Sequence, residues 1–137
     1  MNDSARQPRG VGGWLLVLTA LLLVWRPVNA ALVASGALAA LSVRGPSLPL
    51  ALIALTIVTS FGVAAGIALA SRRGPAVTMA QAALLLSAGM DLVVYLSPYF
   101  PINRMPTDVP LYVGASLLYH GVWLAYLARS RRVRHTY

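Results

Sequence analysis

Residues 48–71 read LPLALIALTIVTSFGVAAGIALAS, and none of them carries a charge. A helix rises about 1.5 Å per residue, so a stretch of this length can cross the ~30 Å hydrocarbon core of a bilayer. The apolar residues form a continuous run and do not alternate with polar ones. We therefore predict a membrane-spanning helix and not a barrel strand, because only helices and closed barrels satisfy their backbone hydrogen bonds in lipid.

Three further apolar stretches accompany this one, at residues 11–43, 76–96 and 109–128. The breaks between stretches contain Arg-Gly-Pro triplets or several prolines, which end helices. The sequence therefore predicts an all-α membrane protein, a four-transmembrane-helix bundle in one domain over residues 11–128. We expect residues 1–10 to be a disordered lead and residues 129–137 to be a basic tail.

The composition supports a lipid-facing surface. Apolar residues make up 58% of the 137 residues and charged residues only 10%, against about 25% charged in a soluble domain. The net charge of +8 comes from arginines at the borders of apolar runs, so we expect no nucleic-acid partner. Cysteine is absent, which excludes disulfides and thiolate metal sites, and we expect no metal or cofactor.

The arginines also predict an orientation. With four spans, eight arginines fall on the side of the two termini and two on the other side, and positive residues stay in the cytoplasm. Both termini are therefore predicted to be cytoplasmic. The eight are Arg6, Arg9, Arg72, Arg73, Arg129, Arg131, Arg132 and Arg134, and the two are Arg44 and Arg104. A rival interpretation takes residues 14–25 as the core of a signal peptide cleaved after Ala30.

Two opposite charges lie inside predicted spans. Arg26 and Asp91 sit about 20 and 22 Å from the cytoplasmic starts of their helices, at 1.5 Å per residue. A charge at such depth normally has a partner, so we predict a buried ion pair between the first and third spans. The pair is interpreted either as a clamp that fixes the two helices or as part of a proton or ion relay.

Other polar and small residues define helix faces. Asn29, Gln81 and His120 are candidates for a polar path with Arg26 and Asp91. Gly62 and Gly66 form a GxxxG motif, which permits close helix packing. The last span has two contrasting faces, and either can be its core. One consists of Tyr112, Ser116, Tyr119, Trp123 and Tyr126, and the other of Gly114, Gly121, Ala125 and Ala128.

Two terminal motifs suggest a family. Gly12-Gly13-Trp14-Leu15 opens the first span, and Tyr126-Leu-Ala-Arg-Ser-Arg-Arg-Val-Arg-His-Thr-Tyr137 closes the last. This layout resembles the bacterial membrane family called domain of unknown function 2569. The resemblance implies four helices in a bacterial cytoplasmic (inner) membrane and supplies no catalytic residue. The cationic tail either lies on anionic lipid headgroups or docks a cytosolic partner. Its cations are Arg129, Arg131, Arg132 and Arg134.

No catalytic motif is present, and Asp91 has no second aspartate in the spans for intramembrane proteolysis. We therefore expect a non-enzymatic accessory or structural subunit of a membrane assembly. Its partners would be lipid and either another membrane protein or further copies of this chain. The alternative is a small-solute or proton transporter that uses the polar path between the first, third and fourth spans.

Overall fold

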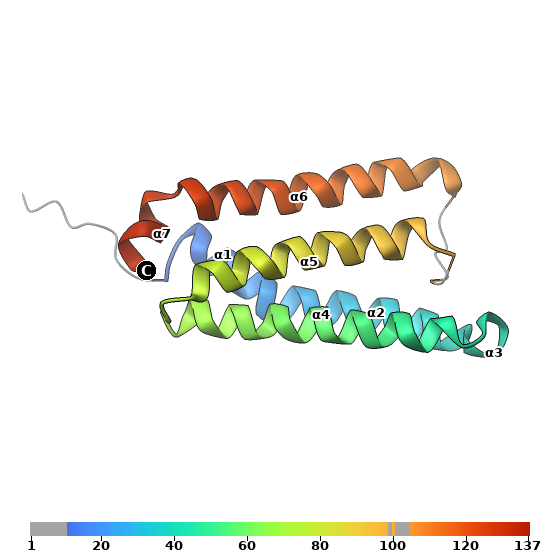
Figure 1. Ribbon diagram of the computed structural model, residues 1–137. Coiled ribbons are helices and arrows are strands. Elements are labelled where there is room, and N and C mark those ends of the chain that lie inside the picture. The colour runs from blue at the N-terminus through green and yellow to red at the C-terminus, as the bar shows by residue number, and fades with distance from the viewer. Residues whose placement is uncertain (1–10, 99, 101–104) are drawn as a thin grey trace, which may run out of the picture.

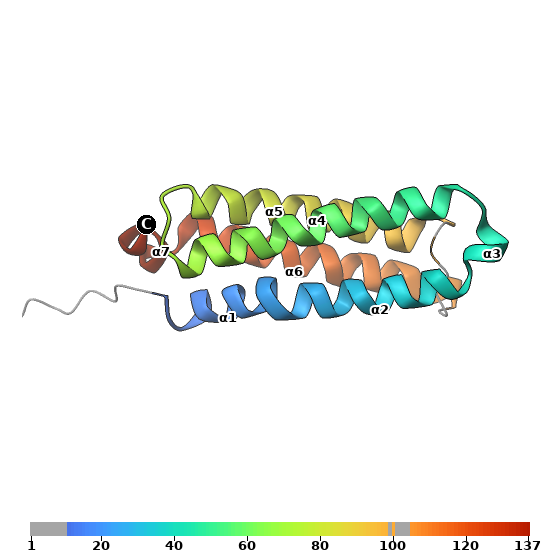
Figure 2. The same ribbon diagram turned by 90° about the horizontal axis from the view of Figure 1, so that it is seen from below.

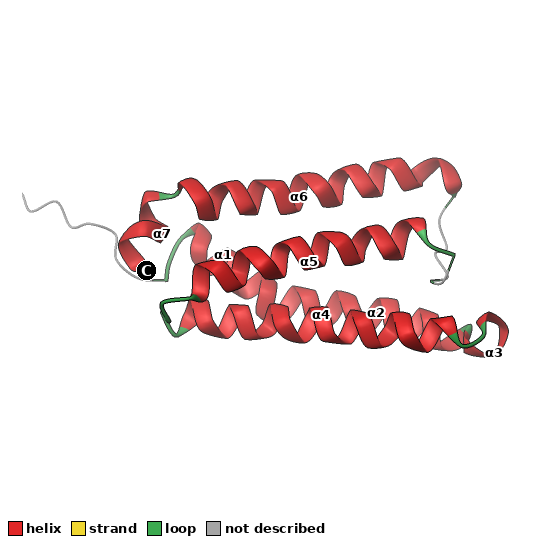
Figure 3. Cartoon of the chain, viewed as in Figure 1, coloured by secondary structure: helices red, strands yellow, loops and turns green. Residues whose placement is uncertain are grey.

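The computed structural model describes residues 11–98, 100 and 105–137, and the regular elements in these ranges are all helical. The first span consists of α1 (Trp14–Ala20), the π-helical turn η1 (Leu21–Trp25) and α2 (Arg26–Ala39), which continue one another (Figure 1). The remaining elements are α3 (Leu41–Arg44), α4 (Ser47–Ala70), α5 (Ala76–Leu96), the 3-10 turn η2 (Pro106–Asp108), α6 (Val109–Arg129) and α7 (Arg131–Thr136). Figure 3 shows that short loops join α3 to α4 and α4 to α5.

Four helical stretches are long and apolar enough to cross a membrane, as the sequence predicts. They are Trp14–Ala39, Ser47–Ala70, Ala76–Leu96 and Pro106–Arg129. The first is shorter than the predicted 11–43, because the chain turns at Ala40 and begins the separate short helix α3. The basic tail contains a helix of its own, α7.

The four spans pack in chain order. The first span packs against α4, α4 against α5, and α5 against α6. The first and last described residues lie at one end of the bundle together with α7, and we call this the terminal end (Figures 1 and 2). The opposite end, which holds α3, is the far end.

The π-helical turn η1 precedes Pro27. Proline lacks an N–H, and its ring clashes with the carbonyl four residues earlier in a regular α-helix. The wider turn over Leu21–Trp25 accommodates that ring. This turn packs against Gly66 of α4, where an added Cβ would come within 2.9 Å of the Leu23 side chain.

Two apolar cores fill the bundle, one near each end. The terminal core is the larger and contains Leu15, Leu18, Leu22, Ala65, Ala68, Leu69, Ala76, Ala80, Ala83, Leu84, Trp123, Leu127 and Val133. The far core contains Ala37, Leu48, Leu55, Met90, Val94 and Phe100.

The tail helix α7 packs on the terminal end. Val133 is buried in the terminal core, and the Tyr137 hydroxyl donates a hydrogen bond to the carbonyl of Leu69 at the end of α4. The Arg132 guanidinium lies over Gly13, where an added Cβ would be only 2.7 Å from Nη1. Gly13 also has a φ of 58°, which disfavours residues with a side chain. The two terminal motifs therefore contact each other.

Candidate functional site

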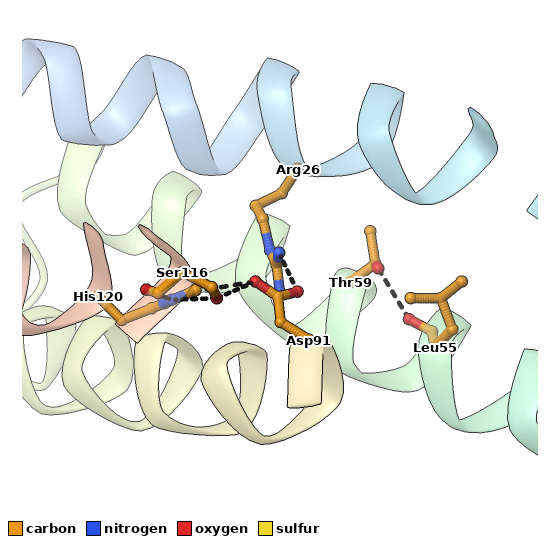
Figure 4. A network of polar contacts seen from close by, with 6 residues as sticks. All are labelled: Arg26, Leu55, Thr59, Asp91, Ser116 and His120. Carbon is orange, nitrogen blue, oxygen red and sulfur yellow. Dashed lines mark hydrogen bonds and ion pairs between the residues drawn. The ribbon is translucent and has the colours of Figure 1, made fainter. Parts of the chain in front are cut away.

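The charged residues predicted inside the spans meet in the structure. Arg26, the first residue of α2, donates a hydrogen bond from Nη1 to Asp91 Oδ1 of α5 at 3.0 Å. Their side chains are 10% and 18% exposed. Figure 4 shows Arg26 reaching from its helix toward Asp91. Opposite charges in contact reduce the cost of placing each one inside the bundle.

The last span completes the arrangement through two side chains. Ser116 of α6 donates a hydrogen bond to the second carboxylate oxygen, Asp91 Oδ2, at 2.7 Å. His120 follows one turn later, with its Nε2 4.0 Å from the same oxygen. Asp91 therefore connects α2 to α6. We call Arg26, Asp91, Ser116 and His120 the polar layer (Figure 4). It lies between the terminal and far cores.

The contact between His120 and the backbone defines the ring's orientation. Nδ1 lies 2.7 Å from the carbonyl oxygen of Ser116, one turn earlier in α6. The ring is 2% exposed. The described residues contain no group of three His, Cys, Asp or Glu side chains able to hold a metal ion, so the polar layer matches no metal site.

A cavity of about 200 Å³ borders the polar layer. Polar and aromatic side chains from η1, α2, α5 and α6 line it. They include Trp25, Arg26, Asn29, Asp91, Tyr95, Tyr112, Ser116 and Tyr119. The predicted path residue Asn29 therefore lies at this cavity. Gln81 does not: it sits ten residues before Asp91 on α5, about 15 Å closer to the terminal end, so the two do not form one continuous path.

The structure also distinguishes the two faces of α6. Ser116, His120 and Trp123 are buried, so the polar and aromatic face points inward. Gly114 and Gly121 are exposed on the opposite face, and an added Cβ at either would meet open space. The expectation that these two glycines pack helices together is not met within the chain. Of the GxxxG pair, Gly66 is in tight contact, whereas Gly62 is buried with room to spare.

The predicted tail residues separate into two groups. Arg129, Arg131 and Arg134 are exposed at the terminal end, whereas Arg132 is half-buried over the Gly12-Gly13 turn. Sequence reasoning missed this contact, and it also missed Ser116 as a partner of Asp91, whereas it did place His120 with Asp91 on the candidate polar path. The position of Ser116 in the last span, at a depth near that of Asp91, is the signal that could have indicated this hydrogen bond.

Comparison of the chain with protein-family models, with curated proteins and with solved structures finds no match. The geometry of the site therefore carries the functional argument. A charged pair bonded to a hydroxyl, with an imidazole beside it, can hold three helices together, and a cavity adjoins it.

Proposed function

We propose that the protein is a non-enzymatic accessory or structural subunit of a membrane assembly. The observation that carries this proposal is the pairing of the charges within the spans: Arg26 and Asp91 bond to each other, and Asp91 also bonds to Ser116. A polar layer whose members bond to each other holds helices together, and such interhelical bonds are worth about 1 kcal/mol each.

The packing toward the terminal end supports a structural role. Below the polar layer, Leu22 and Trp123 belong to a core of buried apolar side chains that extends to α7. The polar side chains buried on this side, among the described residues, are Thr19, which bonds to the Leu15 carbonyl of its own helix, and Ser87, so no hydrogen-bonded chain leads from the layer through this core. A conducting path would need one, because ions and polar solutes are not stable in an apolar interior.

The outer face of α6 supports association with another membrane helix. Gly121 and Ala125 are exposed four residues apart, and Gly114 lies two turns before Gly121. Small residues let helix backbones approach closely in lipid. The partner we propose is a transmembrane helix of a different chain.

The size of the particle in native-membrane nanodiscs tests this proposal. We expect the full chain to be extracted in a complex larger than one 14.5-kDa chain. Gly121→Leu should release a single chain, because the larger side chain prevents close approach. Gly36→Leu is the matched control, since Gly36 is also exposed with open space around it on α2. A wild-type particle of one chain, or of copies of this chain alone, contradicts the accessory role.

A second candidate is a small-solute or proton transporter, and the cavity beside Arg26 and Asp91 favours it. Asp91→Asn separates the two functions. A transporter should lose flux in proteoliposomes while the fold remains, whereas a structural layer should lose stability in detergent.

We further propose that both termini are cytoplasmic and that the membrane is the inner membrane of a bacterium. Support comes from the eight arginines on the side of the termini against two opposite. The start of α1 and the C-terminal end of the chain lie at the same end of the bundle, which agrees with this orientation (Figure 1). We also propose that the chain is a member of the family called domain of unknown function 2569, on the two terminal motifs that resemble it; in this chain those motifs meet where Arg132 lies over Gly13.

A further inference from the structure

The hydrogen on the His120 ring can be assigned from its neighbours. Nδ1 lies 2.7 Å from the carbonyl oxygen of Ser116, and a carbonyl can only accept a hydrogen bond. Nδ1 must therefore carry a hydrogen. In the neutral ring the other nitrogen, Nε2, is then an acceptor with a lone pair.

No described residue donates a hydrogen bond to that lone pair. Nε2 is buried and has no hydrogen-bond partner among the described residues. Asp91 Oδ2 lies 4.0 Å away, but it is itself an acceptor and already receives the Ser116 hydroxyl. Leaving a buried acceptor unpaired costs about 1–3 kcal/mol. A single hydrogen between the two atoms removes this defect.

We propose that Asp91 and His120 bind one proton between them, which makes the polar layer a proton-binding site inside the membrane-spanning bundle. The proton forms an N–H bond at His120 Nε2 and a hydrogen bond to Asp91 Oδ2. The two atoms approach from 4.0 Å to about 2.8 Å when it binds. This inference does not depend on the accessory role.

The charges around the site make this binding selective for a single proton. Arg26 on α2 faces Asp91 and balances its charge, so the layer is neutral without the proton and carries +1 with it. The titratable neighbours that line the adjoining cavity are Tyr112 and Tyr119 on α6 and Tyr95 on α5. The elements α1, η1 and α4 contain no titratable side chain. A second proton would need both Asp91 and His120 protonated beside Arg26, which leaves the guanidinium without its counter-charge.

The proton has a route from one direction. The cavity of about 200 Å³ touches Asp91 and Ser116, and Asp91 is the more exposed member of the ion pair. On the terminal side, Trp123 and Leu127 close the layer with apolar surface. Exchange therefore occurs through the cavity.

Proton counting by potentiometric titration of the full chain in micelles tests the shared site. Between about pH 4 and 9, where carboxylates and imidazoles titrate, His120→Asn should bind one proton fewer than wild type. Asp91→Asn should also bind one fewer, and the double variant should again bind only one fewer. Independent titration of the two residues would make the loss in the double variant equal to the sum of the two single losses, and this result overturns the proposal. A loss of zero in either single variant overturns it as well.

A measurement on the wild-type chain guards against variants that misfold. Nitrogen-15 NMR of labelled imidazoles should show His120 Nδ1 protonated throughout the titration, while Nε2 changes from a lone pair to an N–H. His135, exposed on α7, provides the internal reference for an ordinary imidazole. A His120 ring protonated on Nε2 alone, or one that never changes, contradicts the proposal.

Discussion

The terminal and far parts of the bundle are built differently. In the terminal part, leucine and alanine side chains from all four spans form one large core, and α7 covers its end. Beyond the polar layer the far core is smaller, and a cavity separates parts of α2, α5 and α6. No described residue of α6 belongs to the far core, and here hydrogen bonds to Asp91 join α2, α5 and α6. Apolar packing therefore holds the helices together in the terminal part, whereas hydrogen bonds and the ion pair hold them together at the polar layer.

Removing the carboxylate of Asp91 should have the largest effect on the stability of the bundle. Asp91→Asn leaves the buried Arg26 guanidinium without its counter-charge, and breaking a buried pair costs about 3 kcal/mol. The free energy of unfolding should fall by about that amount. It can be measured in mixed micelles by following denaturation with the near-UV circular dichroism of the tryptophans. Asp108→Asn is the matched control, because Asp108 is exposed in η2 and should change stability by less than about 0.5 kcal/mol. Equal effects of the two substitutions would contradict the role of the polar layer.

Crowding the terminal core should have an intermediate effect. Gly66→Ala places a methyl group 2.9 Å from Leu23 and 3.2 Å from the Cβ of Leu22, at the π-helical turn. Overpacking of this kind costs about 1–3 kcal/mol. Gly62→Ala, on the same helix with no atom within 4 Å of its added Cβ, should cost much less. The same unfolding assay compares them, and a larger loss for Gly62→Ala would show that η1 does not lie against Gly66.

The contact between the tail and the bundle should contribute least and should depend on pH. Burial raises the pKa of Tyr137, partly offset by the charge of Arg72. Only the neutral phenol donates to the Leu69 carbonyl, so the stabilisation is present below the ordinary tyrosine pKa of about 10 and is lost as pH rises through the higher value of the folded state. Tyr137→Phe should therefore cost about 0.5 kcal/mol near pH 8 and nothing at higher pH. If the stability difference between wild type and Tyr137→Phe grew as pH rises, that result would contradict this prediction.

The sequence predicts the spans well because hydropathy over about 20 residues is a one-dimensional property. The last three predicted spans begin and end within about one residue of the observed helices. The contact between Arg26 and Asp91 follows from matched depth alone. The π-helical turn is harder to predict from the sequence. Pro27 indicates only that the helix is distorted, and several kinds of distortion accommodate proline.

Residues that depend on tertiary contacts are harder to predict. Periodicity places Ser116 and Gly114 on opposite faces of α6, but both faces are compatible with packing in lipid. The choice is made by Asp91 of a neighbouring helix, which bonds to Ser116. Likewise, the composition of the tail indicates a cationic surface, whereas the position of Arg132 over Gly13 depends on where the two ends of the chain meet.

A double-mutant cycle on the ion pair tests the central claim, that Arg26 and Asp91 stabilise the bundle through direct contact. Because Arg26→Gln removes the charge that Asp91→Asn leaves unpaired, the double variant should be no less stable than Asp91→Asn alone. The cycle should therefore give a coupling free energy of about 2 kcal/mol or more. Additive losses, with a coupling energy near zero, would contradict the account.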